Sequence, residues 1–196
     1  CIRDSSNTNP YFTNDGMSKS TSLVFSETDV SSSSTASYLS DTVAYGVSYN
    51  IPISETQSYG YGIEALLNDY TTTAGSPSNV TNFINKYGET HFGFRLSANY
   101  TEDTRDRTVY ATVGKRQGIL ANMYIPPDFE YSYASVRFEG EYNTPYVLNF
   151  LNIFDWNTVF QIRPQLGFGL GLIDSSDLPF HDKFFAGGDR TVRGFD

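Results

Sequence analysis

The sequence predicts an all-β protein, specifically part of an antiparallel transmembrane β-barrel. Apolar and polar residues alternate with a period of two along most of the 196 residues, and this alternation is the primary signal of a β-strand. Tyr and Phe occur 15 times each and favour strands. No apolar run reaches the roughly 18–20 residues that a transmembrane helix needs. Strands, rather than helices, are therefore expected to make up the fold.

Seven segments show the alternation. In the clearest one, 157–172, even positions such as Phe160 and Leu166 are mostly apolar, and odd positions are polar or glycine. The predicted strands are 17–28, 36–51, 58–68, 91–101, 115–125, 131–146 and 157–172, and 173–196 is predicted to be a long loop.

One stretch between strands has helical spacing instead. Val80, Phe83, Ile84 and Tyr87 follow the i, i+3, i+4, i+7 pattern of a short helix. Ser78 or Asn79 is the expected cap at its start, and Gly88 follows its end.

The polar faces of the strands separate a membrane barrel from a soluble β-sandwich. A soluble sheet turns its polar face to water, and such a face usually carries many Lys and Glu. Here the polar faces hold mainly Ser, Gly, Asn, Thr and Gln, which suit a crowded barrel interior. Tyr at strand ends suits the aromatic girdle at the membrane interface; these are Tyr49, Tyr59, Tyr100 and Tyr146. The apolar faces are thus expected to meet lipid.

Composition argues against several other functions. The net charge of −9 disfavours nucleic acid, whose binding needs clustered Lys and Arg. Cys1 is the single cysteine, so no internal disulfide is expected, and His91 and His181 lack metal-ligand spacing. No Ser/His/Asp set suggests an enzyme. No catalytic residue, metal or cofactor is therefore predicted.

Two glutamates could be mistaken for an acid/base pair. Glu139 and Glu141 lie two apart on one strand face, with Arg137 and Arg163 on inward faces nearby. We expect an ion-pair network inside the barrel.

The chain is expected to be a piece of a longer protein. It carries no signal peptide. Seven antiparallel strands leave an open edge, and in lipid each unsatisfied backbone group costs several kcal/mol. About half of a barrel is therefore expected to lie outside the chain.

Two motifs identify a family. The final loop carries a Gly-Gly pair followed by a Val-Arg-Gly-Phe run: Gly187, Gly188, Val192, Arg193, Gly194 and Phe195. Near the start, an Asn-Pro-Tyr-Phe turn is followed by Asp-Gly: Asn9, Pro10, Tyr11, Phe12, Asp15 and Gly16. Both motifs, at this spacing, resemble those of BamA-type outer-membrane protein assembly factors over about residues 8–196.

The resemblance implies a function. Such a protein is a non-enzymatic insertase that folds β-barrel proteins into the bacterial outer membrane, with periplasmic repeat domains, absent here, before a sixteen-stranded barrel. The resemblance also implies that 173–196 folds into the lumen, where Arg193 pairs with the wall of later strands. The implied partners are unfolded barrel clients, accessory outer-membrane lipoproteins and the lipid bilayer. A two-partner secretion or TamA-type translocation pore remains the alternative, and a passive porin is a third reading that the loop motif disfavours.

Overall fold

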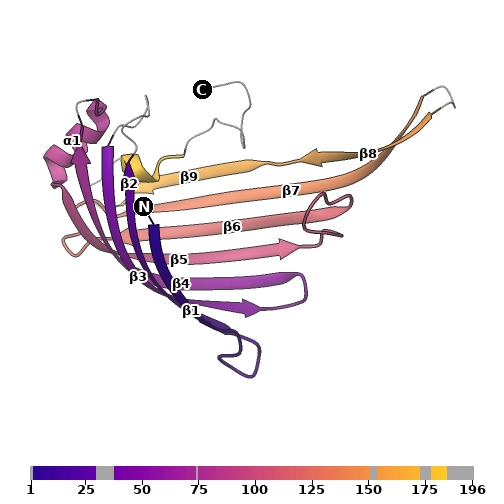
Figure 1. Cartoon of the computed structure of the whole chain (residues 1–196), viewed down its shortest axis with the longest axis horizontal. Helices are drawn as coiled ribbons and strands as arrows, with labels where there is room; N and C mark the ends of the chain where they lie inside the picture. The colour runs from indigo at the N-terminus through magenta and orange to yellow at the C-terminus, as the bar shows by residue number, and fades with distance from the viewer. Residues whose placement is uncertain (1, 30–37, 74, 151–153, 173–177, 185–196) are drawn as a thin grey trace.

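The described residues form one curved antiparallel sheet, with one α-helix at one end of its strands (Figure 1). The computed structural model describes residues 2–29, 38–73, 75–150, 154–172 and 178–184. Within these ranges the strands are β1 (Ile2–Asn9), β2 (Ser18–Asp29), β3 (Tyr38–Pro52), β4 (Gln57–Thr72), β5 (Thr90–Asp103), β6 (Gly114–Ile125), β7 (Tyr133–Phe150), β8 (Phe154–Ile162) and β9 (Gln165–Gly171). Successive strands pair from β1 to β8, and β9 also pairs with β7.

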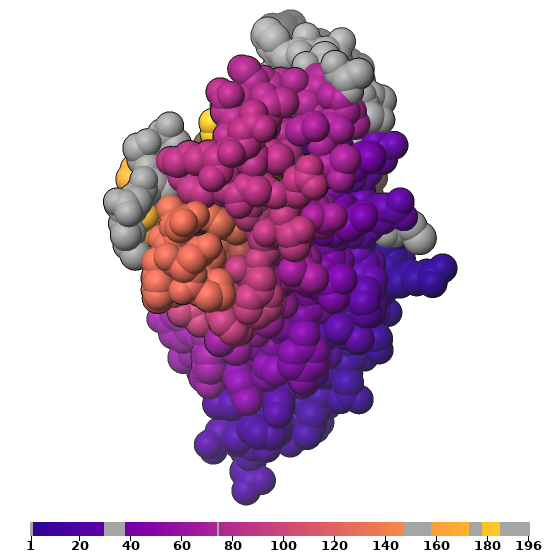
Figure 2. Space-filling model, turned by 90° about the vertical axis from the view of Figure 1, so that its left-hand side faces the viewer, coloured from indigo at the N-terminus to yellow at the C-terminus, as the bar shows by residue number. Residues whose placement is uncertain are grey.

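The links between strands lie at the two ends of the strands, and we call these two sides of the sheet the α1 edge and the turn edge. The α1 edge carries the long link 73–89, which contains α1 (Ser78–Tyr87), and the link 126–132. Figure 2 looks onto this edge and shows α1 in magenta beside the orange 126–132 link. The turn edge carries the links 10–17, 53–56 and 104–113.

One face of the sheet, the outer face, is apolar and exposed. Its rows run straight across the strands, so that Ile63 of β4 lies opposite both Val47 of β3 and Leu96 of β5. In water, each such side chain forgoes roughly 1.5–3 kcal/mol of burial free energy. Exposed members of this face include Leu23, Phe25, Val43, Tyr45, Tyr61, Ile63, Leu67, Phe92, Phe94, Leu96, Ile119, Val136, Phe160, Leu166 and Phe168. These are the side chains that the alternation assigned to the apolar faces, so the predicted faces are confirmed.

The inner face is lined by small residues, which let larger ones lie flat against the wall. Tyr124 of β6 lies over Gly93 of β5, where a Cβ would come 2.5 Å from the ring's Cζ. On the same face Ala44 and Leu66 are buried with Tyr124 and Tyr133. The described core therefore lies inside the curve of the sheet, near the α1 edge.

Strand β1 was not predicted. Segment 2–9 has no apolar alternation and is exposed throughout. It pairs with β2 in unbroken register, from Ile2 opposite Ser26 to Asn9 opposite Lys19. The backbone ladder, which leaves no hydrophobic pattern in the sequence, accounts for this strand.

The predicted strand 157–172 is divided into β8 and β9 by Arg163 and Pro164. Proline has no N–H and cannot donate a ladder hydrogen bond. The register is nevertheless the same on both sides, with Ile162 opposite Tyr142 and Gln165 opposite Glu139. The Gly140 N–H still donates to the Pro164 carbonyl at 2.9 Å.

Pairing in the β7–β8 hairpin also extends further than predicted. The segment between the predicted strands 131–146 and 157–172 continues the ladder as far as Phe150 and Phe154. Since β6 begins at Gly114, opposite Asn143, the hairpin reaches past β6 at the turn edge (Figure 1).

The predicted helix is confirmed as α1, and its residues Val80 and Ile84 are buried. Its cap differs from the prediction, because the helix begins at Ser78 and the cap position falls on Pro77, which makes no side-chain cap hydrogen bond. Gly88 ends the helix at a φ of +91°, and its N–H donates to the Ile84 carbonyl. None of the helices in the described ranges has the length and apolar character that a membrane crossing requires.

Candidate functional site: the loop root on the inner wall

The Asn-Pro-Tyr-Phe motif forms the β1–β2 turn at the turn edge. The Tyr11 N–H donates to the Asn9 side-chain oxygen at 3.2 Å, and the Phe12 N–H donates to the Met17 carbonyl at 2.8 Å. Gly16 takes a φ of +81°, which a residue without a Cβ adopts at little cost. The Phe12 ring packs on Tyr49 of β3, with ring centroids 5.8 Å apart.

The C-terminal motif, with its six residues between Gly187 and Phe195, lies outside the described residues. The described part of the same loop is 178–184, which we call the loop root. It includes a short 3-10 helix, η1 (Phe180–Asp182), that packs on the inner face at the α1 edge.

Phe180 fixes the loop root to the wall. Its ring lies 4.9 Å from that of Tyr38, 5.3 Å from Tyr70 and 5.3 Å from Phe83 of α1, all edge to face. Only 6% of Phe180 is exposed. Aromatic pairs with this geometry contribute about 0.5–1.5 kcal/mol each beyond area burial. The loop root is therefore clamped between the sheet and the helix.

His181 extends the same contact. Its ring stacks on Tyr70 at 5.2 Å, and its Nε2 lies 3.5 Å from the Tyr133 hydroxyl. Burial lowers the pKa of His181 to about 4, and the Asp182 carboxylate beside it offsets only part of that effect. Nδ1 is buried and has no hydrogen-bond partner. The imidazole is therefore neutral at pH 7.

Further aromatic side chains complete the surface beneath the loop root. The Tyr124 and Tyr131 hydroxyls lie 3.0 Å apart, and Phe83 of α1 meets Tyr131 edge to face at 5.5 Å. We call the set the inner aromatic cluster. Its members are Tyr38, Tyr70, Phe83, Tyr87, His91, Tyr124, Tyr131, Tyr133, Phe180 and His181.

His91 and His181 lie far apart in the sequence and lack metal-ligand spacing, but the fold brings both into this cluster. His91 is 4% exposed, lies 5.6 Å from the Tyr70 ring, and has a buried Nε2 without a partner. Large aromatics on a strand face otherwise made of small polar residues, such as Tyr131 and Tyr133, were the signal that could have revealed the cluster.

The predicted ion-pair network is present on the inner face near the turn edge. Glu141 accepts from Arg105 at 3.5 Å and pairs with Arg163 at 3.6 Å, and Arg105 also pairs with Asp103 at 2.7 Å. Arg137 and Glu139 form a looser pair at 3.9 Å. Each carboxylate thus faces a cation, which suits charge balance rather than acid/base catalysis.

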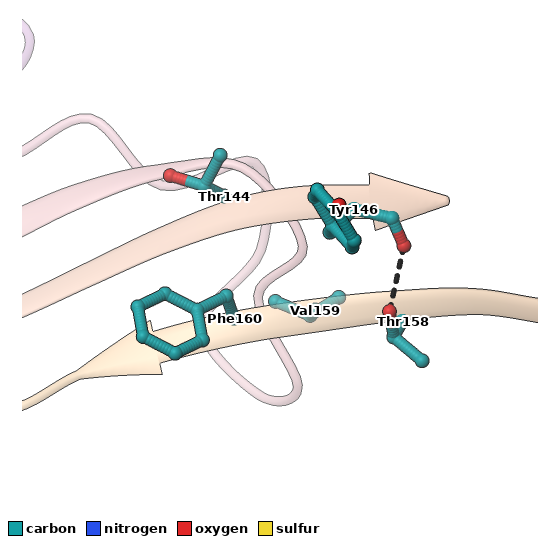
Figure 3. Close-up of a pocket in the computed structure, with 5 residues that line it drawn as sticks. All are labelled: Thr144, Tyr146, Thr158, Val159 and Phe160. Carbon is teal, nitrogen blue, oxygen red and sulfur yellow. Dashed lines mark hydrogen bonds between the residues drawn. The ribbon is translucent and has the colours of Figure 1, made fainter. Parts of the chain in front are cut away.

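Side chains of the paired strands β7 and β8 line a hollow of about 530 Å³ (Figure 3). Its lining residues are Thr144, Tyr146, Thr158, Val159 and Phe160. The Thr158 hydroxyl is already committed, since it donates to the Tyr146 carbonyl at 2.6 Å. None of the residues that line the hollow is charged. In the part of the chain that the structure describes, no three His, Cys, Asp or Glu side chains are grouped to hold a metal ion.

An antiparallel sheet with an apolar outer face, a small-polar inner face and a loop root packed inside is the wall of a transmembrane β-barrel. Residues 4–196 match the sequence model of the Omp85 superfamily domain, and the chain belongs to this superfamily. Its location is the bacterial outer membrane.

The chain is also similar to individual proteins, one by sequence and one by structure. The chain is 23% identical over 199 residues to the outer membrane protein assembly factor BamA of Neisseria meningitidis serogroup B, with 96% of this chain and 24% of the relative covered. The crystal structure of BamA from Haemophilus ducreyi lacking POTRA domains 1–3 matches with a TM-score of 0.83 at 21% identity, covering 99% of this chain and 37% of that one. The chain therefore spans about a quarter of the curated relative's length.

Proposed function

We propose that the chain forms part of the barrel wall of an outer-membrane insertase, which folds and inserts β-barrel proteins without enzymatic chemistry. The observation that carries the proposal is the alignment with a named outer-membrane protein assembly factor over 96% of the chain. The turn motif and the C-terminal loop motif both fall within the aligned superfamily domain.

The loop root gives the proposal a physical basis. A barrel that handles unfolded clients has to keep its own interior ordered while the wall around it changes. Phe180 and His181 anchor the loop that carries Arg193 to β3, β4 and α1. We propose that this anchor holds the motif loop in the lumen, where Arg193 would meet a carboxylate or aromatic partner on another part of the wall.

The proposed partners follow from this function. They are unfolded outer-membrane β-barrel clients, which would pair by strand edges, and accessory outer-membrane lipoproteins. A two-partner secretion or TamA-type translocation pore of the same superfamily is the alternative.

Depletion of the full-length protein in its host tests the proposal. An insertase predicts that several unrelated outer-membrane barrels fall together, as measured by quantitative proteomics of outer-membrane fractions. A fall in one secreted protein, with barrel levels unchanged, would contradict the insertase and favour a secretion pore.

A further inference from the structure

Lys19 occupies an unusual position for a cation. It lies on the outer face of β2, between Asn9 of β1 and Tyr49 of β3, near the turn edge. The same face carries exposed apolar side chains further along β2, at Leu23 and Phe25. Lys19 therefore lies at the boundary between the apolar side chains of the outer face and the 10–17 turn.

Aromatic rings hold the Lys19 side chain in place. Its Nζ lies 5.2 Å from the centroid of the Phe12 ring and 6.0 Å from that of Tyr49. Tyr49 is itself stacked on Tyr61 of β4 at 5.3 Å. Ring faces attract a cation but leave its charge in place, so the ammonium keeps its capacity for an anion.

The contrast with Lys115 is informative. Lys115 of β6 shares the outer face and the turn edge, but its Nζ lies 3.2 Å from Glu102 Oε1. Among the ion pairs of the described residues, none includes Lys19. Two lysines in similar positions thus differ in whether their charge is already neutralised.

The links assign the turn edge to one side of the membrane. Outer-membrane barrels have short periplasmic turns and longer extracellular loops. The shortest turn whose residues are all described, 53–56, lies at the turn edge, and the longest link between two strands, 73–89 with its helix, lies at the opposite edge. The turn-edge link 104–113 is longer than 126–132, so the assignment rests on the shortest turn and the longest link. The turn edge therefore faces the periplasm, and the outer face beside it meets the headgroups of the inner, phospholipid leaflet.

We propose that Lys19, Phe12 and Tyr49 form a binding site for the phosphate of a glycerophospholipid in the periplasmic leaflet. The Lys19 ammonium binds the phosphate oxygens, and the Phe12 and Tyr49 rings pack against the glycerol and upper acyl region. Basic and aromatic side chains are the groups that anchor proteins at this depth. The site would give the Asn-Pro-Tyr-Phe turn a role at the membrane, independent of the insertase proposal.

Native mass spectrometry of the full-length protein tests the site, with phosphatidylglycerol as the probe. Lys19→Gln should weaken retention of the tightest-bound lipid about fivefold, the effect of roughly 1 kcal/mol for one basic side chain near an anionic surface. Lys19→Arg should retain the lipid, and Lys115→Gln, the matched control, should change it little. Equal losses for Lys19→Gln and Lys115→Gln would overturn the proposal.

Photo-crosslinking of the wild-type protein does not depend on any variant folding. A phosphatidylglycerol that carries a photoreactive group near its headgroup should label the peptide containing Phe12 and Lys19 more than the peptide containing Lys115. Excess inorganic phosphate should leave the labelling unchanged. Equal labelling of the two peptides, or its loss in phosphate, would overturn the lipid site.

Discussion

The imidazole of His181 lies stacked on the phenol ring of Tyr70, with centroids 5.2 Å apart and an interplanar angle of 21°. The two residues belong to elements far apart in the sequence, the loop root and β4. Their contact joins the motif-bearing loop to the barrel wall. The strength of this contact can be changed by pH and by substitution.

Acidification should release the loop root. An exposed His has a pKa of about 6.5, whereas burial lowers that of docked His181 to about 4. Docking is therefore most favourable above pH 6.5. It becomes less favourable as the pH falls from 6.5 towards 4, because the undocked state binds the proton more readily. The protection of 178–184 against hydrogen exchange in the full-length protein, corrected for the intrinsic exchange rate at each pH, should fall over this window.

His181→Phe is the control for this pH dependence. The ring keeps its place on Tyr70 but no longer titrates, so the protection of the loop root against exchange, corrected for the intrinsic rate at each pH, should become nearly independent of pH between 6.5 and 4. The groups that face His181 are Tyr70, Tyr133, His91, Asp182 and Arg95. An unchanged pH profile in the variant would assign the effect to one of those groups instead.

Removal of the Phe180 ring should undock the loop root directly. Phe180→Ala deletes a side chain that is 6% exposed, at an expected cost of about 3–5 kcal/mol. Phe184→Ala, in the same segment but 40% exposed, should cost less. The readout is again hydrogen exchange of 178–184, and equal effects of the two variants would contradict the clamp at Phe180.

A charge on the outer face should destabilise the barrel. Leu96→Arg in β5 places a guanidinium against lipid, with an expected loss of about 2–4 kcal/mol near the bilayer midplane. Ser97→Arg, one residue on, points to the inner face and should be tolerated better. Urea titration of the full-length protein in lipid vesicles measures both, and a larger loss for Ser97→Arg would reverse the assignment of faces.

Asp106 should keep the 104–113 link in a fixed conformation. Its carboxylate accepts hydrogen bonds from the Thr112 hydroxyl and from the Thr112 and Val113 N–H groups, and these bonds hold the pKa of Asp106 well below its usual range. Asp106→Ala should increase proteolytic cleavage within 104–113. Asp15→Ala, in the other long turn at the same edge, should leave cleavage of 104–113 unchanged, and equal cleavage in wild type and Asp106→Ala would contradict this role.

Alternation revealed most of the wall because a strand buried on one face and lipid-exposed on the other repeats every two residues. It located Leu96 and Phe160 on the correct face, and helical spacing located α1. It could not locate β1, whose pairing comes from the backbone alone, or the break at Pro164.

The inner aromatic cluster was missed for a different reason. Its members come from β3, β4, α1, β5, β6, the 126–132 link, β7 and the loop root, so no local pattern joins Tyr38 to Phe180. Only the sheet register and the path of the loop bring them together. The inner-face ion pairs, by contrast, were predictable because Arg163 and Glu141 already shared a face on segments expected to be neighbours.

The most direct test of the insertase proposal is client folding by the full-length protein in proteoliposomes, measured by the heat-modifiable gel mobility of a urea-unfolded barrel client. An insertase should fold the client faster than empty liposomes do, and Arg193→Ala should fold it more slowly than wild type although that variant's own barrel remains inserted. Client folding no faster than in empty liposomes would contradict the proposed function.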